Sequence, residues 1–392
     1  MRAEAGAVAE AAVAAPLAAV REAAADAAAL HPRGSGQWWP DAPPGARILD
    51  LSSLDHVPRV DAADLVATVG AGCRLDRLTD ALGAHGCWLA LDPPGPGSRT
   101  LGGALAAGGG GPLAALFGPP RDQVLGLSMI AGNGTLVRVG GRVVKNVAGF
   151  DLAKAVIGAH GGFGAIVEVH LRLRARAQAD RTAAWTGPRE AVAAAGARLM
   201  AAGALPAAFE VLHPALAAAL GLGPQWALLV RALGTPAAVD EELSAAHDAA
   251  RGLVSAAPAA EAWTAWREAV GTWPAVLRIG ADPTAWTDAC ALAADHLGTV
   301  AGASVTVPRG TVRVGAPGVT PAALRALREA AARRRWPVTL ERADAATRAA
   351  CGLWGALDPG VERLTRALRQ TFDPADRLPR ARYFGVAMTA DQ

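Results

Sequence analysis

The sequence predicts an α+β protein, and three features support that prediction. Between residues 165 and 174, apolar and polar side chains alternate, which is the pattern of a half-buried β-strand. Between residues 181 and 345, short β-branched runs alternate with helical runs, which favours an antiparallel sheet with helices on one face. Glycine-rich turns separate the strands expected before residue 176. We therefore expect a turn-rich first part, a sheet-and-helix domain and a closing helix over 360–370.

The composition leaves room for two domains and limits the classes of function. The chain has 392 residues, of which 52% are hydrophobic and 19% charged, so it can bury sizeable cores. A net charge of +3 does not indicate nucleic-acid binding. The four cysteines include no C-x-x-C pair, which predicts neither a zinc nor an iron–sulfur site. There is no uninterrupted apolar run of about 18 residues, and the Ala-rich start carries acidic residues, unlike a signal peptide. We therefore expect a cytoplasmic protein with at most peripheral membrane association.

The chain is expected to begin with a helix, a glycine-containing loop and two strands. The Ala-rich residues 1–30 have high helix propensity. Gly34-Ser35-Gly36 follows, where successive main-chain N–H groups can form an anion-binding concavity, although such a tripeptide is also an ordinary turn. Strands are expected at 48–51 and 64–69. The leucines of 75–82 then recur at helical spacing and predict an amphipathic helix.

A second glycine-rich stretch follows a strand expected at 88–91. Pro94 belongs to a proline pair that ends this strand. Thr100-Leu101-Gly102-Gly103 then begins a run of small residues that continues to Gly111. Such a run lets the backbone pack against a flat, wide cofactor and exposes N–H groups to phosphate. The alternative is a mobile glycine-rich surface loop.

Two hairpins are expected next. Arg121 and Asp122 precede a strand at 124–131 and are either a surface ion pair or part of a site. Asn133-Gly134 and Gly140-Gly141 then join successive β-branched runs, and both dipeptides favour the positive φ angles of tight hairpin turns.

A polar turn after the second hairpin leads into a short helix and a further strand. Lys145 and Asn146 end a strand, and Gly149 precedes the helix entry. Asp151 can cap a helix over 152–157. Gly162 and Gly164 then lead into the alternating strand, which contains Ile166.

Residues 174–188 are expected to be a linker to the sheet-and-helix domain. Several helical runs in that domain have proline in the first turn, where its missing N–H costs nothing. Strands are expected at 226–230, 275–279, 304–307, 312–314 and 338–340, and helices at 188–202, 236–251, 283–296 and 321–335.

Two motifs carry a resemblance to a known superfamily. KNVAGFDL, followed by IGAHGGFGAIVEV, is similar to the segment that closes the FAD-binding domain of the vanillyl-alcohol oxidase/p-cresol methylhydroxylase superfamily. Within it, GGRVVKNVAGFDL resembles the FAD-binding accessory subunits of bacterial glycolate oxidase complexes. The resemblance spans roughly residues 25–175 and returns in FDPADRLPRARY near the C-terminus.

The resemblance implies FAD as the cofactor and a division of the chain into three parts. These are an FAD-binding domain of the p-cresol methylhydroxylase type over 1–176, an α+β cap domain over 177–345, and a C-terminal helix with a segment that returns to the FAD domain over 346–392. The implied FAD-binding residues are Gly34, Ser35, Gly36, Pro94, Thr100, Leu101, Gly102, Gly103, Arg121, Asp122, Lys145, Asn146, Gly149, Asp151, Gly162, Gly164 and Ile166.

The resemblance also implies an FAD-dependent oxidoreductase subunit that is not catalytic alone. It would support electron transfer in a hetero-oligomeric glycolate oxidase or dehydrogenase, which converts glycolate to glyoxylate, beside a catalytic flavoprotein and an iron–sulfur subunit. Catalytic relatives carry a histidine-containing metal cluster near the C-terminus, whereas no histidine follows His296 here. Glu261, Asp282 and Glu341 are isolated in the sequence, so we assign no catalytic residue and no metal site. The alternatives are a self-sufficient FAD-dependent hydroxy-acid oxidase and a flavin-free scaffold subunit of the same fold.

Overall fold

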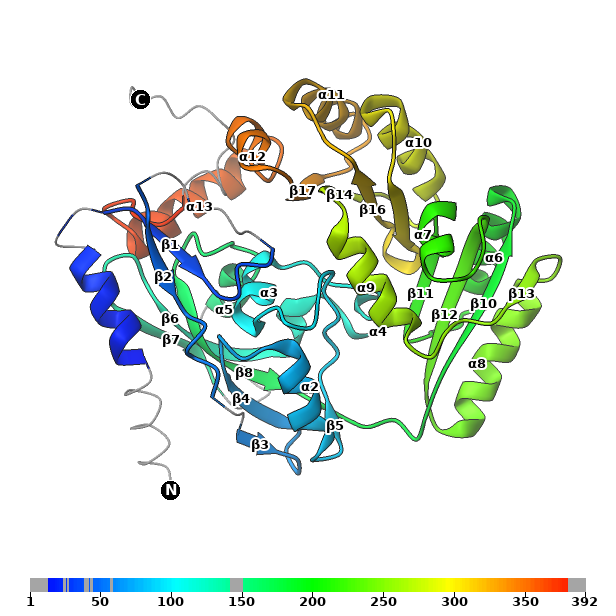
Figure 1. Cartoon of the computed structure of the whole chain (residues 1–392), viewed down its shortest axis with the longest axis horizontal. Coiled ribbons are helices and arrows are strands. Elements are labelled where there is room, and N and C mark those ends of the chain that lie inside the picture. The colour runs from blue at the N-terminus through cyan, green and yellow to red at the C-terminus, as the bar shows by residue number, and fades with distance from the viewer. Residues whose placement is uncertain are drawn as a thin grey trace.

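The structure, a computed structural model, describes residues 13–23, 26, 28–38, 42, 45–56, 59–141 and 151–379. Two antiparallel sheets lie beside each other and are surrounded by helices (Figure 1). The first sheet is built from residues 59–172 and the second from residues 179–342. Helices and antiparallel sheets occur together, so the predicted α+β class is confirmed.

The five-stranded sheet organises the first part of the chain. Its strands, in sheet order, are β3 (Arg59–Asp61), β4 (Val66–Gly70), β8 (Ala165–Arg172), β6 (Val124–Ile130) and β7 (Leu136–Gly140), and every neighbouring pair is antiparallel. The predicted Asn133-Gly134 turn joins β6 to β7, with Gly134 at a φ of +77°. Gly140 also has a positive φ, but the strand expected after it lies outside the described residues.

Three helices pack against this sheet. They are α2 (Leu75–Gly83), α3 (Leu101–Ala107) and α5 (Leu152–Val156). The predicted leucine face of α2 is buried in one core cluster with Leu105 of α3 and with Leu127 and Val169 of the sheet. The remaining elements of this part are the short α4 (Ala114–Phe117), the 3-10 turn η1 (Pro120–Gln123), and β5 (Cys87–Trp88) paired with β9 (Arg174–Ala175).

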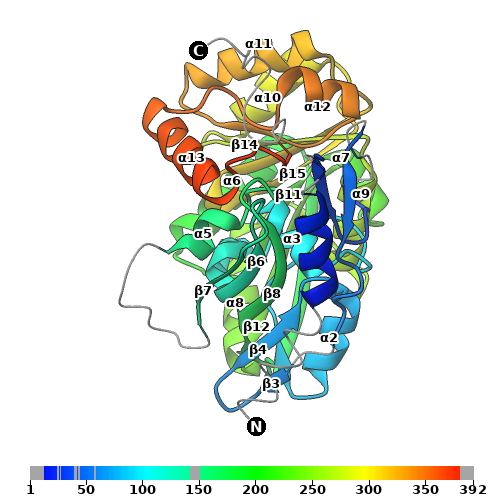
Figure 2. The same ribbon diagram turned by 90° about the vertical axis from the view of Figure 1, so that its left-hand side faces the viewer.

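The start and the end of the chain meet on this first part. β1 (Leu30–Arg33) and β2 (Arg47–Asp50) form a parallel pair, and residues 13–23 form a helix beside them. After α12 (Ala345–Cys351), α13 (Pro359–Phe372) comes back to the same region (Figures 1 and 2). The N–H of Leu30 donates to the carbonyl of Arg377 at 2.7 Å, and Leu378 is buried with Val20 and Leu49. The predicted return of the C-terminal segment is therefore confirmed.

The second sheet has eight strands, all antiparallel to their neighbours. In sheet order they are β13 (Val254–Ala256), β10 (Ala179–Gly187), β12 (Trp226–Gly234), β11 (Ala208–Leu212), β15 (Gly302–Thr306), β16 (Thr311–Ala316), β14 (Ala275–Gly280) and β17 (Val338–Arg342). The 3-10 turn η2 (Val307–Arg309) joins β15 to β16. All five strands expected in this region are present. The expected linker, however, contains the nine-residue strand β10, because its partner β12 pairs with it from Ala179 to Gly187.

Helices cover both faces of this sheet, so the prediction of helices on one face was wrong. α6 (Arg189–Ala201), α8 (Pro236–Ala249), α10 (Trp286–Leu297) and α11 (Pro321–Ala332) bury one face. α7 (Pro214–Ala219) and α9 (Ala262–Thr272) cover part of the other. The reason is that the second face also carries apolar residues, among them Leu212, Leu229 and Val276, which must leave water.

The second face of the eight-stranded sheet is turned towards the first part of the chain. The N–H of Gly95 donates to the carbonyl of Arg267 on α9 at 2.8 Å. Arg313 on β16 donates through its guanidinium to the carbonyl of Gly110. The glycine-rich segments on either side of α3, at Gly95 and Gly110, therefore lie between the two sheets.

Candidate functional site

Three adjoining pockets form one elongated hollow, which begins in the first part of the chain and ends against the second sheet. The inner pocket is lined by Gly161, Gly164 and Ile166, and the middle pocket by the Gly34–Gly36 loop. Thr100 and Gly103 line both of these pockets. The outer pocket is lined by residues 107–109, Gly158 and side chains from β14 and β17. Because neighbouring pockets share lining residues, we treat them as one hollow.

Glycines allow the loops around the hollow to pack against each other. A Cβ on Gly34 would lie closer than 3.0 Å to the hydroxyl of Thr100, and one on Gly102 would lie 2.7 Å from the Cβ of Ala71. A Cβ on Gly108, which has a φ of +66°, would lie 2.5 Å from the Cα of Gly158. The Thr100 hydroxyl also accepts the N–H of Gly103 at 3.3 Å. Main-chain atoms rather than side chains therefore form much of the wall.

The predicted site residues that line this hollow come from all three glycine-bearing bends. Those in the inner and middle pockets are Gly34, Ser35, Gly36, Thr100, Gly102, Gly103, Gly164 and Ile166. Pro94 lines the outer pocket. The structure thus brings together residues that are more than 100 positions apart in the chain, such as Ser35 and Ile166.

The remaining predicted site residues do not line the hollow or lie outside the described residues. Leu101 is fully buried in the core of the first sheet, and Gly162 is buried, with its carbonyl accepting from a guanidinium of α13. Asp151 caps α5 by accepting the N–H of Lys154 at 3.3 Å. Arg121 and Asp122 are exposed in η1. Lys145, Asn146 and Gly149 lie outside the described residues.

The second sheet carries a row of polar side chains, which sequence reasoning missed, and two of them, Arg278 and Thr339, line the outer pocket. Ser304, Arg313, Arg278 and Thr339 are direct cross-strand neighbours on β15, β16, β14 and β17. Each alternates with apolar residues that face the opposite core, so all four point towards the first part of the chain. The signal was present, because each arginine is the single charged residue in an otherwise apolar strand.

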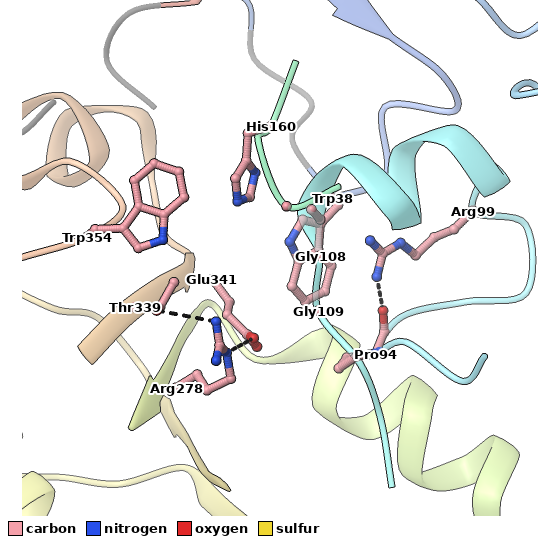
Figure 3. Close-up of a pocket in the computed structure, with 12 residues that line it drawn as sticks. Trp38, Pro94, Arg99, Gly108, Gly109, His160, Arg278, Thr339, Glu341 and Trp354 are labelled. Carbon is pink, nitrogen blue, oxygen red and sulfur yellow. Dashed lines mark hydrogen bonds and ion pairs between the residues drawn. The ribbon is translucent and has the colours of Figure 1, made fainter. Parts of the chain in front are cut away.

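Glu341, which looked isolated in the sequence, is the counter-charge of this row. Its carboxylate accepts from Arg278 Nε at 2.8 Å (Figure 3). It also accepts from Arg313 Nε at 2.8 Å. Burial opposes its ionisation, but the charges of Arg313 and Arg278 outweigh that effect and hold the pKa of the carboxyl below its usual value. Arg278 and Arg313 are adjacent on neighbouring strands and repel each other, and the negative charge of Glu341 offsets this repulsion.

Trp38 and His160 close the hollow from the side of the first sheet. The Trp38 ring lies under the guanidinium of Arg99, 4.4 Å from its centroid, and Arg342 of β17 lies 5.7 Å from the same ring. His160 is buried, lines all three pockets and meets Trp354 edge to face at 5.6 Å (Figure 3). The loop at Trp38 is therefore tied to both parts of the chain.

Two further acids, the half-buried Asp92 and the buried Glu210, have raised pKa values. Asp92 accepts the N–H of Leu113 at 3.0 Å, and burial raises the pKa of its carboxyl to about 6. Glu210 accepts from the hydroxyl of Ser304, and burial raises the pKa of Glu210 to about 7. Both acids are therefore easily protonated.

The charge of the hollow suits FAD. FAD carries its formal charge on a diphosphate, and the described residues that line the inner and middle pockets include Arg33 and Arg99 but no acidic side chain. Among the described residues, no group of three or more His, Cys, Asp or Glu side chains is placed to hold a metal ion. Within the same described ranges, none of the helices has both the length and the apolar character needed to cross a bilayer.

Comparisons with known proteins agree with this fit. Residues 6–140 match the family model described as "FAD binding domain". Over 139 residues the chain is 35% identical to glycolate oxidase subunit GlcE of Escherichia coli, a match that covers 35% of this chain and 40% of that protein. It is 29% identical over 169 residues to glycolate oxidase subunit GlcD of Bacillus subtilis, covering 43% of this chain and 36% of that protein. The matches span less than half the length of these relatives.

Solved structures match over most of the chain. Alkyldihydroxyacetonephosphate synthase superposes with a TM-score of 0.66 at 16% identity, covering 92% of this chain and 73% of that one. The 6-hydroxy-D-nicotine oxidase of Arthrobacter nicotinovorans superposes with a TM-score of 0.62 at 18% identity, covering 91% of this chain and 87% of that one. At these identities the likenesses show that the fold is shared with these two enzymes. Residues 6–140 therefore carry an FAD-binding domain, and FAD is the cofactor.

Proposed function

We propose that this chain is the FAD-binding subunit of a multi-subunit glycolate oxidase or dehydrogenase, which oxidises glycolate to glyoxylate. The coarser statement, an FAD-dependent oxidoreductase related to enzymes of hydroxy acids, follows from relatives such as the glycolate oxidase subunits and the mitochondrial D-lactate dehydrogenase of Arabidopsis thaliana. The observation that supports the proposal is the hollow walled by main chain, part of which is formed by the IGAHGGFGAIVEV motif, the motif that resembles the FAD-binding domain of the superfamily.

The division of labour follows from which residues line the hollow. When bound, FAD accepts a hydride and passes electrons on singly. The Gly34–Gly36 loop and Thr100–Gly103 would hold its diphosphate, and Gly164 and Ile166 its adenosine end. Trp38 and Trp354 would exclude water from the outer pocket. In this proposal residues 1–176 form the FAD domain, 177–345 the cap and 346–392 the return segment.

The proposed partners are a catalytic flavoprotein and an iron–sulfur subunit, in the cytoplasm. The test is to purify the chain alone and together with these subunits, and to measure bound FAD and glycolate-dependent dye reduction. We expect about one FAD per chain, no turnover alone and turnover in the complex. A folded chain that neither retains nor rebinds FAD would favour the scaffold alternative instead.

A second candidate, a self-sufficient FAD-dependent hydroxy-acid oxidase, is favoured by one observation. The outer pocket carries Arg278, Thr339 and His160, polar groups suited to bind a small carboxylate beside a flavin. Turnover of a hydroxy acid by the chain alone, with dioxygen or a dye as acceptor, would establish this candidate in place of the subunit role.

A further inference from the structure

Arg99 is a buried cation without an acidic partner among the described residues. Its side chain is 3% exposed, and its hydrogen bond to a described residue runs from Nη1 to the carbonyl of Pro94. Its guanidinium stacks on Trp38 and lines both the middle and the outer pocket (Figure 3). A buried charge is costly unless a counter-charge compensates it, so this arrangement calls for an anion.

The carboxylates of the described residues do not supply that anion. The acid that acts most strongly on Arg99 is Glu341, but both oxygens of its carboxylate already accept from Arg278 and Arg313. Burial, together with the repulsion of other arginines, lowers the pKa of Arg99 to about 9. The local charge around Arg99 is therefore positive on balance.

The position of Arg99 points to the part of FAD that carries charge. Arg99 immediately precedes Thr100, whose hydroxyl lies against the main chain of Gly34. The middle pocket, which Arg99 lines, contains the whole Gly34–Gly36 loop, and its described lining residues include no acidic side chain. The other arginine of that pocket, Arg33, already has Asp50 at 4.0 Å. Arg99 is thus the arginine there whose charge is not balanced by a described carboxylate.

We propose that Arg99 is the buried counter-charge of the FAD diphosphate, held against it by Trp38. The inference rests on the hollow being the FAD site, and it adds a cation without a described counter-charge to a cradle formed largely by main chain. The effect of Arg99 on stability therefore has opposite signs in the apo protein and in the FAD complex. Without FAD, the uncompensated guanidinium destabilises the fold; with FAD bound, the same group stabilises the complex.

The test uses the full chain stripped of FAD, with Arg99→Gln, Arg99→Lys and the control Arg325→Gln, an exposed arginine on α11. Calorimetry would compare ADP, which carries a diphosphate, with adenosine, which does not. We expect Arg99→Gln to lower the affinity for ADP at least tenfold and the affinity for adenosine less than twofold. Arg99→Lys should keep most of the affinity for ADP, and the control should change neither ligand.

Melting temperatures separate this role from a purely structural one. Apo Arg99→Gln should melt no lower than the apo wild type, and its gain in melting temperature on adding FAD should be smaller. A lower melting temperature of the apo variant, or equal losses for ADP and adenosine, would overturn the proposal. So would unchanged ADP affinity with a shifted flavin reduction potential, because Arg99 would then serve the flavin ring. Wild-type protein that binds neither ADP nor FAD would defeat the assignment of the hollow itself, which is a different failure.

Discussion

The substitution Glu341→Gln tests whether the two parts of the chain meet over a buried ion network. Glu341 accepts from Arg278 and Arg313, and Arg313 also donates to the carbonyl of Gly110 in the first part of the chain. The glutamine has nearly the same shape but no charge. It would leave two neighbouring arginines in the sheet without their shared counter-ion.

The expected loss follows from the burial of each partner. Removing one member of a buried ion pair costs about 3–5 kcal/mol, because the other charge stays buried and unpaired. Arg313 is 3% exposed and takes this cost in full, whereas Arg278 is 36% exposed and is partly hydrated. We therefore place the loss in unfolding free energy at about 3 kcal/mol, near the lower end of that range.

Chemical denaturation followed by tryptophan fluorescence and circular dichroism measures this loss. The matched control is Glu362→Gln, which removes an exposed pair with Arg366 on α13 and should cost less than about 0.5 kcal/mol. The double variant Glu341→Leu with Arg313→Met should lose less than Glu341→Gln alone, because it removes charges on both sides. A Glu341→Gln protein as stable as the Glu362→Gln protein would refute the reasoning.

Two further predictions concern a buried acid and a close backbone contact. The pKa of Glu210 is about 7 in the fold against an ordinary value near 4.5, so the folded protein keeps a proton that the unfolded chain releases. The protonated Glu210 contributes fully to stability below pH 4.5, and this contribution is lost as the pH rises from 4.5 to about 7, a change of about 3 kcal/mol. Glu210→Gln should remove this change from the pH profile of the unfolding free energy. Parallel profiles for the two proteins would contradict the prediction. Gly34→Ala should weaken FAD binding about tenfold or more in fluorescence titrations, because the added Cβ would collide with Thr100. The control Gly83→Ala places its Cβ in open space and should leave the affinity for FAD unchanged. Equal FAD affinities of the Gly34→Ala variant and the wild type would contradict the prediction.

Several features of this protein follow from residues close together in the chain. The Asn133-Gly134 turn needs positive φ, the leucines of α2 share one helix face, and Pro236 and Pro321 begin α8 and α11 where a missing N–H costs nothing. Such preferences act over a few residues. They are therefore visible in the sequence, as are the glycine-bearing bends around the hollow.

Other features depend on which distant strands become neighbours. Glu341 meets Arg278 across 63 positions, and Arg99 and Trp38 come together from different loops, so no local pattern could pair them. We predicted a linker in place of β10 because the strand begins with polar residues. Its pairing with β12 along its full length could not be seen in the sequence. Burial and counter-charges belong to the packed fold, because electrostatic cost is set by what surrounds a group in space rather than by its neighbours along the chain.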